Sequence, residues 1–111
     1  MIAITRLVQA LRDLSDEVFQ RKTWLASSGP VVSSFSEQVS QTFDDTGLAE
    51  AVDTGKCPAE LTEESFAALL KLDRAIRKVD QSRPPLELLT NAQVREVRVL
   101  ARRALDMIEG N

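Results

Sequence analysis

The chain has 111 residues, of which 43% are hydrophobic and 28% are charged, and its formal net charge is −3. This composition is too apolar for a disordered chain, and the length fits one folded unit, so we expect a single domain over residues 1–111. The sequence contains no histidine. An imidazole base, a Ser–His or Cys–His pair and a zinc site built from Cys and His are therefore excluded.

The single cysteine, Cys57, cannot form an internal disulfide, so the fold must depend on its hydrophobic core. No apolar run approaches the ~18 residues that a membrane-spanning helix needs. Arg6 stands where an export signal would require an apolar side chain. We therefore expect a cytoplasmic protein that does not enter a membrane.

Apolar residues at steps of three and four predict a first helix over roughly residues 2–20. Its stripe consists of Ile4, Leu7, Val8, Leu11, Leu14 and Val18. The segment 26–30, Ala-Ser-Ser-Gly-Pro, predicts a break, because glycine and proline together stop a helix. Val31 and Val32 then form a short apolar bridge to the next helix.

Ser34 and Glu37 have the spacing of a capping box, in which each side chain bonds the backbone N–H of the other residue at a helix start. The helix that this spacing predicts would end near Gly47, which suits a left-handed position after a helix. A further short helical segment is expected over 48–52, closed by Gly55.

Thr62 precedes two glutamates and is a natural N-cap for a helix near residues 63–80. Residues 82–85, Ser-Arg-Pro-Pro, then predict an extended connection. Thr90 and Gln93 again have capping-box spacing and predict the start of a last helix. With no alternating strand pattern of useful length, the sequence predicts an all-α fold, a single compact bundle of about four to five helices.

Charge is distributed unevenly along the chain. Residues 37–64 carry eight acidic side chains and one basic side chain, whereas residues 65–103 carry nine basic and four acidic ones. These two segments could pair with each other inside the fold, or each could face a separate partner. The acids of the first segment are Glu37, Asp44, Asp45, Glu50, Asp53, Glu60, Glu63 and Glu64.

Asp44 and Asp45 are the first candidate site, and three interpretations are open. Asp45 or Thr46 could cap the turn that begins at Leu48. The two carboxylates could instead accept bonds from a basic partner, or hold Mg²⁺ through water. Glu50 lies just downstream, in the same acidic segment.

The basic side of the last helix is the second candidate. Its arginines are Arg95, Arg98, Arg102 and Arg103, and their spacing could place three or four guanidinium groups along one side. Such a face could contact nucleic-acid phosphates, or it could be a solvated face that pairs with the acidic segment. No aromatic residue lies among these arginines, so nucleic acid is the less expected partner.

Trp24 is the third candidate, because it is the only tryptophan and follows Arg21 and Lys22 near the predicted end of the first helix. Tryptophan is enriched at binding hot spots, where it supplies a large contact area. It also closes the ends of helical cores. Both roles are compatible with the sequence.

The missing catalytic residues and the acidic segment favour a non-catalytic protein that binds another protein, one that is basic. In size, charge and helical content the chain is similar to small acidic bacterial immunity proteins and antitoxins, which inhibit basic nuclease toxins. On this hypothesis the contact residues are Asp44, Asp45, Glu50 and Asp53, with Trp24 as an apolar anchor, and no cofactor is needed.

Two alternatives belong to other classes. One is a helical regulator or nucleic-acid-associated module that uses the four arginines of the last helix. The other is a magnesium-dependent hydrolase built on Asp44, Asp45 and acids of another helix. A homodimer is compatible with all three functions.

Overall fold

The computed structural model describes residues 2–25 and 33–110, and within them every regular element is a helix. The all-α prediction is confirmed, but the described residues form seven helices rather than four to five. The helices are α1 (Ile4–Leu14), α2 (Glu17–Trp24), α3 (Phe35–Phe43), α4 (Leu48–Thr54), α5 (Glu63–Arg77), α6 (Pro85–Thr90) and α7 (Ala92–Glu109). None of the helices in this part of the chain is long and apolar enough to cross a membrane.

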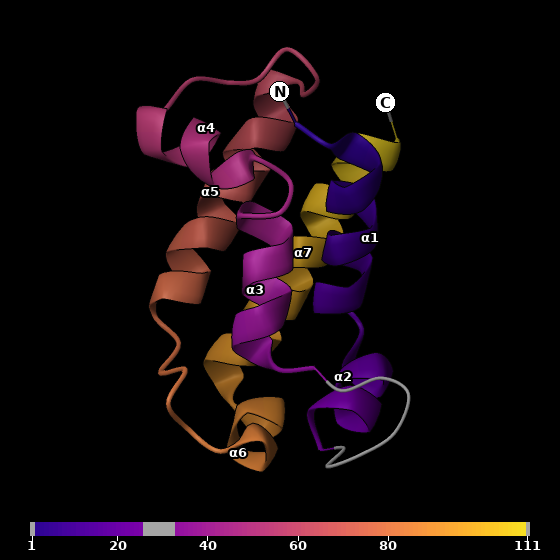
Figure 1. Ribbon diagram of the computed structural model, residues 1–111, viewed down its shortest axis with the longest axis vertical. Coiled ribbons are helices and arrows are strands. Elements are labelled where there is room, and N and C mark those ends of the chain that lie inside the picture. The colour runs from indigo at the N-terminus through magenta and orange to yellow at the C-terminus, as the bar shows by residue number, and fades with distance from the viewer. Residues whose placement is uncertain (1, 26–32, 111) are drawn as a thin grey trace.

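Helices α1, α3, α5 and α7 run along the long axis of the molecule, each antiparallel to the one before it (Figure 1). Helix α7 packs against α5 and α1, and α1 packs against α3. Helices α3 and α5 make no comparable contact, so the fourth side of the bundle is less closed than the other three. The short helices α2 and α6 lie at one end of the bundle, and α4 lies at the opposite end (Figure 1).

The predicted first helix over residues 2–20 is broken in the structure between Leu14 and Glu17. The cause is local, because the side chain of Asp16 accepts a hydrogen bond from the backbone N–H of Phe19 at 3.0 Å and thereby starts α2. The change of direction removes Val18 from the apolar stripe, and its side chain is 64% exposed. The placement of Val18 in the core was therefore wrong.

The predicted helix starts at residues 34 and 62 are confirmed. Ser34 Oγ accepts from the N–H of Glu37 at 3.1 Å, and Thr62 Oγ1 accepts from the N–H of Ser65 at 3.0 Å. The helix that begins after Thr62 ends at Arg77 instead of reaching residue 80.

Two predictions on the C-terminal third are corrected. The chain is extended at Pro84, with φ −59° and ψ 150°, but the extended connection ends there, because Pro85 is the first residue of α6, a position where its missing N–H costs nothing. The cap of α7 is Asn91 rather than Thr90, since Asn91 Oδ1 accepts from the backbone N–H groups of Gln93 and Val94 at 2.8 and 3.3 Å. The predicted break at 26–30 and the bridge of Val31 and Val32 lie outside the described residues.

A buried polar network joins α2, α3 and α7 inside the otherwise apolar core. Arg98 is 8% exposed; its Nε donates to Oε1 of Gln20 at 2.7 Å, and its Nη2 donates to the carbonyl of Leu89 at 3.0 Å. Nε2 of Gln20 donates in turn to the carbonyl of Leu14 at 2.7 Å and to Oε1 of Gln38 at 3.2 Å. One arginine thus anchors the end of the bundle that carries α2 and α6.

Candidate functional site

The acidic side chains of residues 37–64 are all exposed, and none of the eight forms an ion pair with a residue that the structure describes. All but Glu37 lie at the end of the bundle formed by the C-terminus of α3, by α4, and by the start of α5 (Figure 1). We call these seven residues the acidic end: Asp44, Asp45, Glu50, Asp53, Glu60, Glu63 and Glu64.

The basic segment 65–103 does not neutralise the acidic end through ion pairs, because Arg77, Arg83 and Arg102 pair with acids on their own or neighbouring turns and Arg98 pairs with Glu17 on α2, at 3.9 Å. Arg77 Nε lies 2.9 Å from Asp73, and Arg102 Nε lies 3.2 Å from Asp106. Arg83 reaches acids three residues before it and four residues after it. No ion pair therefore joins the acidic and basic segments among the described residues, although Asp53 and Arg77 lie close enough to interact electrostatically.

Helix ends account for some of these acids but not for all. Glu50, Glu63 and Glu64 lie in the first turns of α4 and α5, where the helix dipole favours a negative charge. Asp44 and Asp45 stand at the C-terminus of α3, where the dipole disfavours one by about 0.3–1 kcal/mol. These two carboxylates therefore oppose the stability of their own helix.

Capping does not explain Asp45. The backbone N–H of Leu48 donates to Oγ1 of Thr46 at 3.2 Å, and the Thr46 side chain is buried. Thr46 thus serves the turn before α4, as one of the two alternatives predicted. The Ser40 hydroxyl donates to Asp44 at 3.1 Å, whereas Asp45 is left with its charge at the surface.

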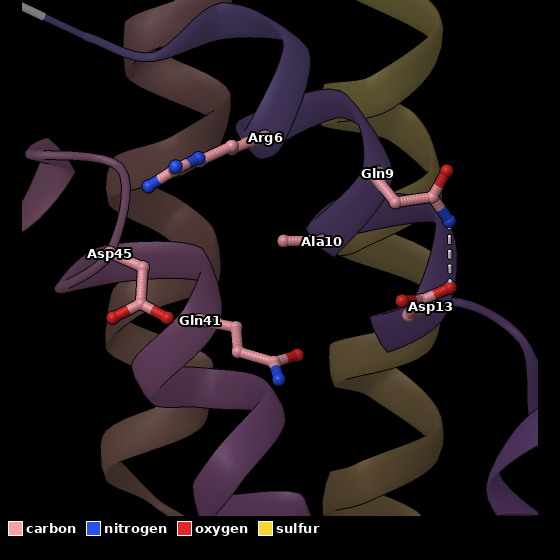
Figure 2. A pocket seen from close by; sticks show the side chains of 6 residues that line it. All are labelled: Arg6, Gln9, Ala10, Asp13, Gln41 and Asp45. Atoms are coloured by element: carbon pink, nitrogen blue, oxygen red, sulfur yellow. Dashed lines mark hydrogen bonds between the residues drawn. The ribbon is translucent and has the colours of Figure 1, made fainter. Parts of the chain in front are cut away.

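Asp44 and Asp45 point to opposite sides of α3. Asp44, together with Asp53, lines a cleft of about 260 Å³ between α3, α4 and α5. Asp45 lines a slot of about 260 Å³ between α1 and α3. Figure 2 shows this slot, with Gln41 on α3, Asp45 in the turn after α3 and the remaining lining side chains on α1. Glu50 borders a third hollow, which also contains Lys56. The four predicted contact acids therefore share one end of the molecule without sharing one face.

The α1–α3 slot contains a carboxylate that the sequence did not single out. Asp13 is half-buried, and its carboxylate accepts a hydrogen bond from Nε2 of Gln9 at 3.0 Å (Figure 2). Burial is the main cause that raises the pKa of Asp13 above its ordinary value, and the Gln9 bond acts in the opposite direction. The repulsion from Asp16 raises this pKa further, while Arg12 lowers it.

This shift predicts the pH dependence of Asp13. The folded state binds the Asp13 proton more tightly than the unfolded chain does, so ionised Asp13 opposes folding, and this unfavourable contribution diminishes as pH falls through the raised pKa of Asp13. We expect Asp13→Asn, whose amide oxygen can still accept from Gln9, to be at least as stable as the parent at pH 7. Urea denaturation of both proteins between pH 7 and 4 measures the difference. An advantage of the variant that grows on acidification would contradict the prediction.

Trp24 lies far from the acids with which it was grouped. Its side chain is 4% exposed and meets Phe35 edge-on, with ring centroids 5.9 Å apart and an angle of 86° between the planes. It belongs to α2, and α2 and α4 occupy opposite ends of the bundle (Figure 1). The structure therefore places Trp24 in the core and does not bring it together with the acidic end.

The predicted basic face of the last helix contains fewer available arginines than the sequence indicated. Arg98 is a core residue, and Arg102 is bonded to Asp106 on the same helix, so Arg95 and Arg103 are the two that form no ion pair with a described residue. The burial of Arg98 corrects the prediction of a continuous row of exposed guanidinium groups. Its sequence position signalled this outcome, because Arg98 is four residues after Val94 and three before Ala101, on the apolar stripe of α7.

The described residues contain no group of three or more Cys, Asp or Glu side chains placed to hold a metal ion. The hypothesis of a magnesium-dependent hydrolase places the metal at Asp44 and Asp45, but these two residues line different hollows. No family model, no curated protein and no solved structure matches the chain.

Proposed function

We propose that this chain is a non-catalytic protein-binding module that recognises a basic protein through its acidic end. The main contact residues are Asp44, Asp45, Glu50 and Asp53. The protein acts as an inhibitor of the immunity or antitoxin type, which covers a basic surface of its partner. The carrying observation is that these acids are exposed and lack ion pairs with any described residue.

Two physical arguments support this proposal. A concentration of unpaired charge of one sign accelerates encounter with a partner of opposite charge and selects against other partners. Asp44 and Asp45 in addition stand where they cost the fold stability, at the C-terminus of α3. Residues that destabilise the fold and make no compensating structural contact are typical of binding sites.

The test compares two double variants with the same change in charge. Asp44→Asn with Asp45→Asn neutralises the acidic end, and Glu37→Gln with Glu96→Gln neutralises two exposed, unpaired acids in the early turns of α3 and α7. We expect the tagged parent to capture one stoichiometric basic protein from the lysate of its own host, and to release it at high salt. The Asp44/Asp45 variant should bind that protein about tenfold more weakly or worse, and the control variant should bind it as the parent does.

Stability measurements on the same proteins separate binding from folding. Neutralising Asp44 and Asp45 should leave the free energy of unfolding unchanged or raise it by about 0.3–1 kcal/mol per charge, because the α3 dipole then meets no negative charge. Equal capture by both double variants would refute the assignment of the site. Recovery of nucleic acid in place of a protein would favour the alternative based on Arg95 and Arg103.

A further inference from the structure

The α3–α5 cleft differs from the other hollows of the acidic end because it combines an apolar floor with an acidic rim. It opens on the side where the long helices are not in close contact. The floor consists of Val39, Phe43, Ala49, Val52 and Ile76. Asp44 stands on the α3 side of the rim and Asp53 at the last turn of α4, while α5 contributes Asp73 and Arg77.

The charges of this rim are not balanced. Arg77 donates to Asp73 at 2.9 Å, and this bond is the main reason why the pKa of Arg77 is raised, with Asp53 adding to the effect from a greater distance. Asp44 and Asp53 have no ion-pair partner in the described part of the chain. Three carboxylates and one guanidinium leave an excess of two negative charges over an apolar surface.

The other hollows do not combine these properties. The α1–α3 slot has Arg6 opposite two carboxylates, and Ala10 is its one apolar lining residue. The groove between α5 and α7 is apolar, but Lys71 and Arg103 outnumber Glu64 on its rim. The α3–α5 cleft is therefore the place that suits a long side chain with an apolar stem and a positive head.

We propose that the α3–α5 cleft receives an arginine side chain of the basic partner. The methylene stem packs over Val39 and Val52, and the guanidinium lies between Asp44 and Asp53, donating to both. Arginine fits better than lysine because its planar head presents several fixed donors and is less strongly hydrated. Buried arginines surrounded by near-neutral contacts are typical hot spots of protein interfaces. This inference rests on the proposed function and names the group that the site recognises.

The first experiment needs no partner. N-acetyl-L-arginine amide is titrated into isotope-labelled protein at low salt, and N-acetyl-L-citrulline amide, which has nearly the same shape without the charge, serves as the control ligand. We expect saturable NMR shifts of the methyl groups of Val39, Val52 and Ile76 with the arginine compound and none with citrulline. The double variant Asp44→Asn with Asp53→Asn should abolish them, whereas Asp45→Asn should not.

The second experiment fills the cleft without changing its charge. Ala49→Met places a longer side chain in the cleft, and Ala67→Met makes the same change in the α5–α7 groove, away from it. Ala49→Met should abolish the arginine shifts and weaken capture of the partner about tenfold, while Ala67→Met should leave both unchanged. The amount of captured partner should depend on salt concentration in the same way as for the parent, because no charge has been removed.

These results separate the two proposals. Capture that depends on Asp44 and Asp45, together with no saturable shift by the arginine compound and no effect of Ala49→Met, overturns the cleft assignment and leaves the proposed function standing. If the arginine compound shifts the Val52 methyl signals but no basic protein is captured, the proposed function is overturned and the assignment of the cleft stands. Shifts of equal size with citrulline, or shifts confined to the α5–α7 groove, also overturn the cleft assignment.

Discussion

Replacing Arg98 with methionine is expected to lower the free energy of unfolding by about 2–5 kcal/mol, although the substitution keeps a long, unbranched side chain. The guanidinium donates to Oε1 of Gln20 and to the carbonyl of Leu89, both inside the protein. Each of these acceptors would lose its bond in a site closed to water, and an unsatisfied buried acceptor costs about 1–3 kcal/mol. Urea denaturation monitored by circular dichroism measures the loss.

Two controls identify the cause. Arg95→Met changes the same charge one turn earlier on an exposed position and should shift stability by less than about 0.5 kcal/mol. Combining Arg98→Met with Gln20→Leu removes an acceptor together with its donor, so the double variant should be more stable than the sum of the two single losses predicts. A loss for Arg98→Met no larger than that for Arg95→Met would show that the network contributes nothing to stability.

Replacing Trp24 with alanine should have an effect of similar size, about 3–5 kcal/mol, because a large buried ring is removed and the core relaxes only in part. The edge-on contact with Phe35 adds to this loss. Trp24→Phe should cost much less, because Nε1 of Trp24 is buried without a hydrogen-bond partner among the described residues, and phenylalanine removes that donor. Thermal unfolding of the three proteins compares the effects.

The same variants decide between the two roles that the sequence left open for Trp24. If Trp24 is a core residue, Trp24→Phe should capture the basic partner as well as the parent does. If Trp24→Phe captures less of the partner while its stability is unchanged, Trp24 contacts the partner as the apolar anchor.

Two of the helix caps that act over a few residues could be predicted from the sequence. Ser34 and Thr62 cap the predicted helices, and both caps depend on atoms within three positions along the chain. The same logic failed at residue 16, because the apolar stripe continued past Asp16 and concealed the competing cap. At Asn91 the cap lay one position beyond the residue that the spacing selected.

The candidate site was foreseen as a set of residues but not as a surface. The sequence identifies Asp44, Asp45, Glu50 and Asp53 as an acidic segment, and the structure gathers all four at one end of the bundle. The sequence alone could not show that Asp44 and Asp45, at the C-terminal end of α3, would face different hollows. Which hollow a side chain faces depends on the helices that flank it.

The sequence by itself determined the helical class, the starts of α3 and α5 and the charge of each segment, because these depend on residue type, periodicity and nearby side chains. Only the tertiary structure decided which charges stay unpaired and which residues enter the core. Arg98 lies on the apolar stripe of α7, but its charged side chain is satisfied in the core because Gln20, 78 positions away, offers it an acceptor. Asp44 and Asp53 form no ion pair with a described residue because Arg77, the arginine that shares their cleft, is bonded to Asp73 on its own helix. Such outcomes depend on the approach of distant segments, which local patterns do not encode.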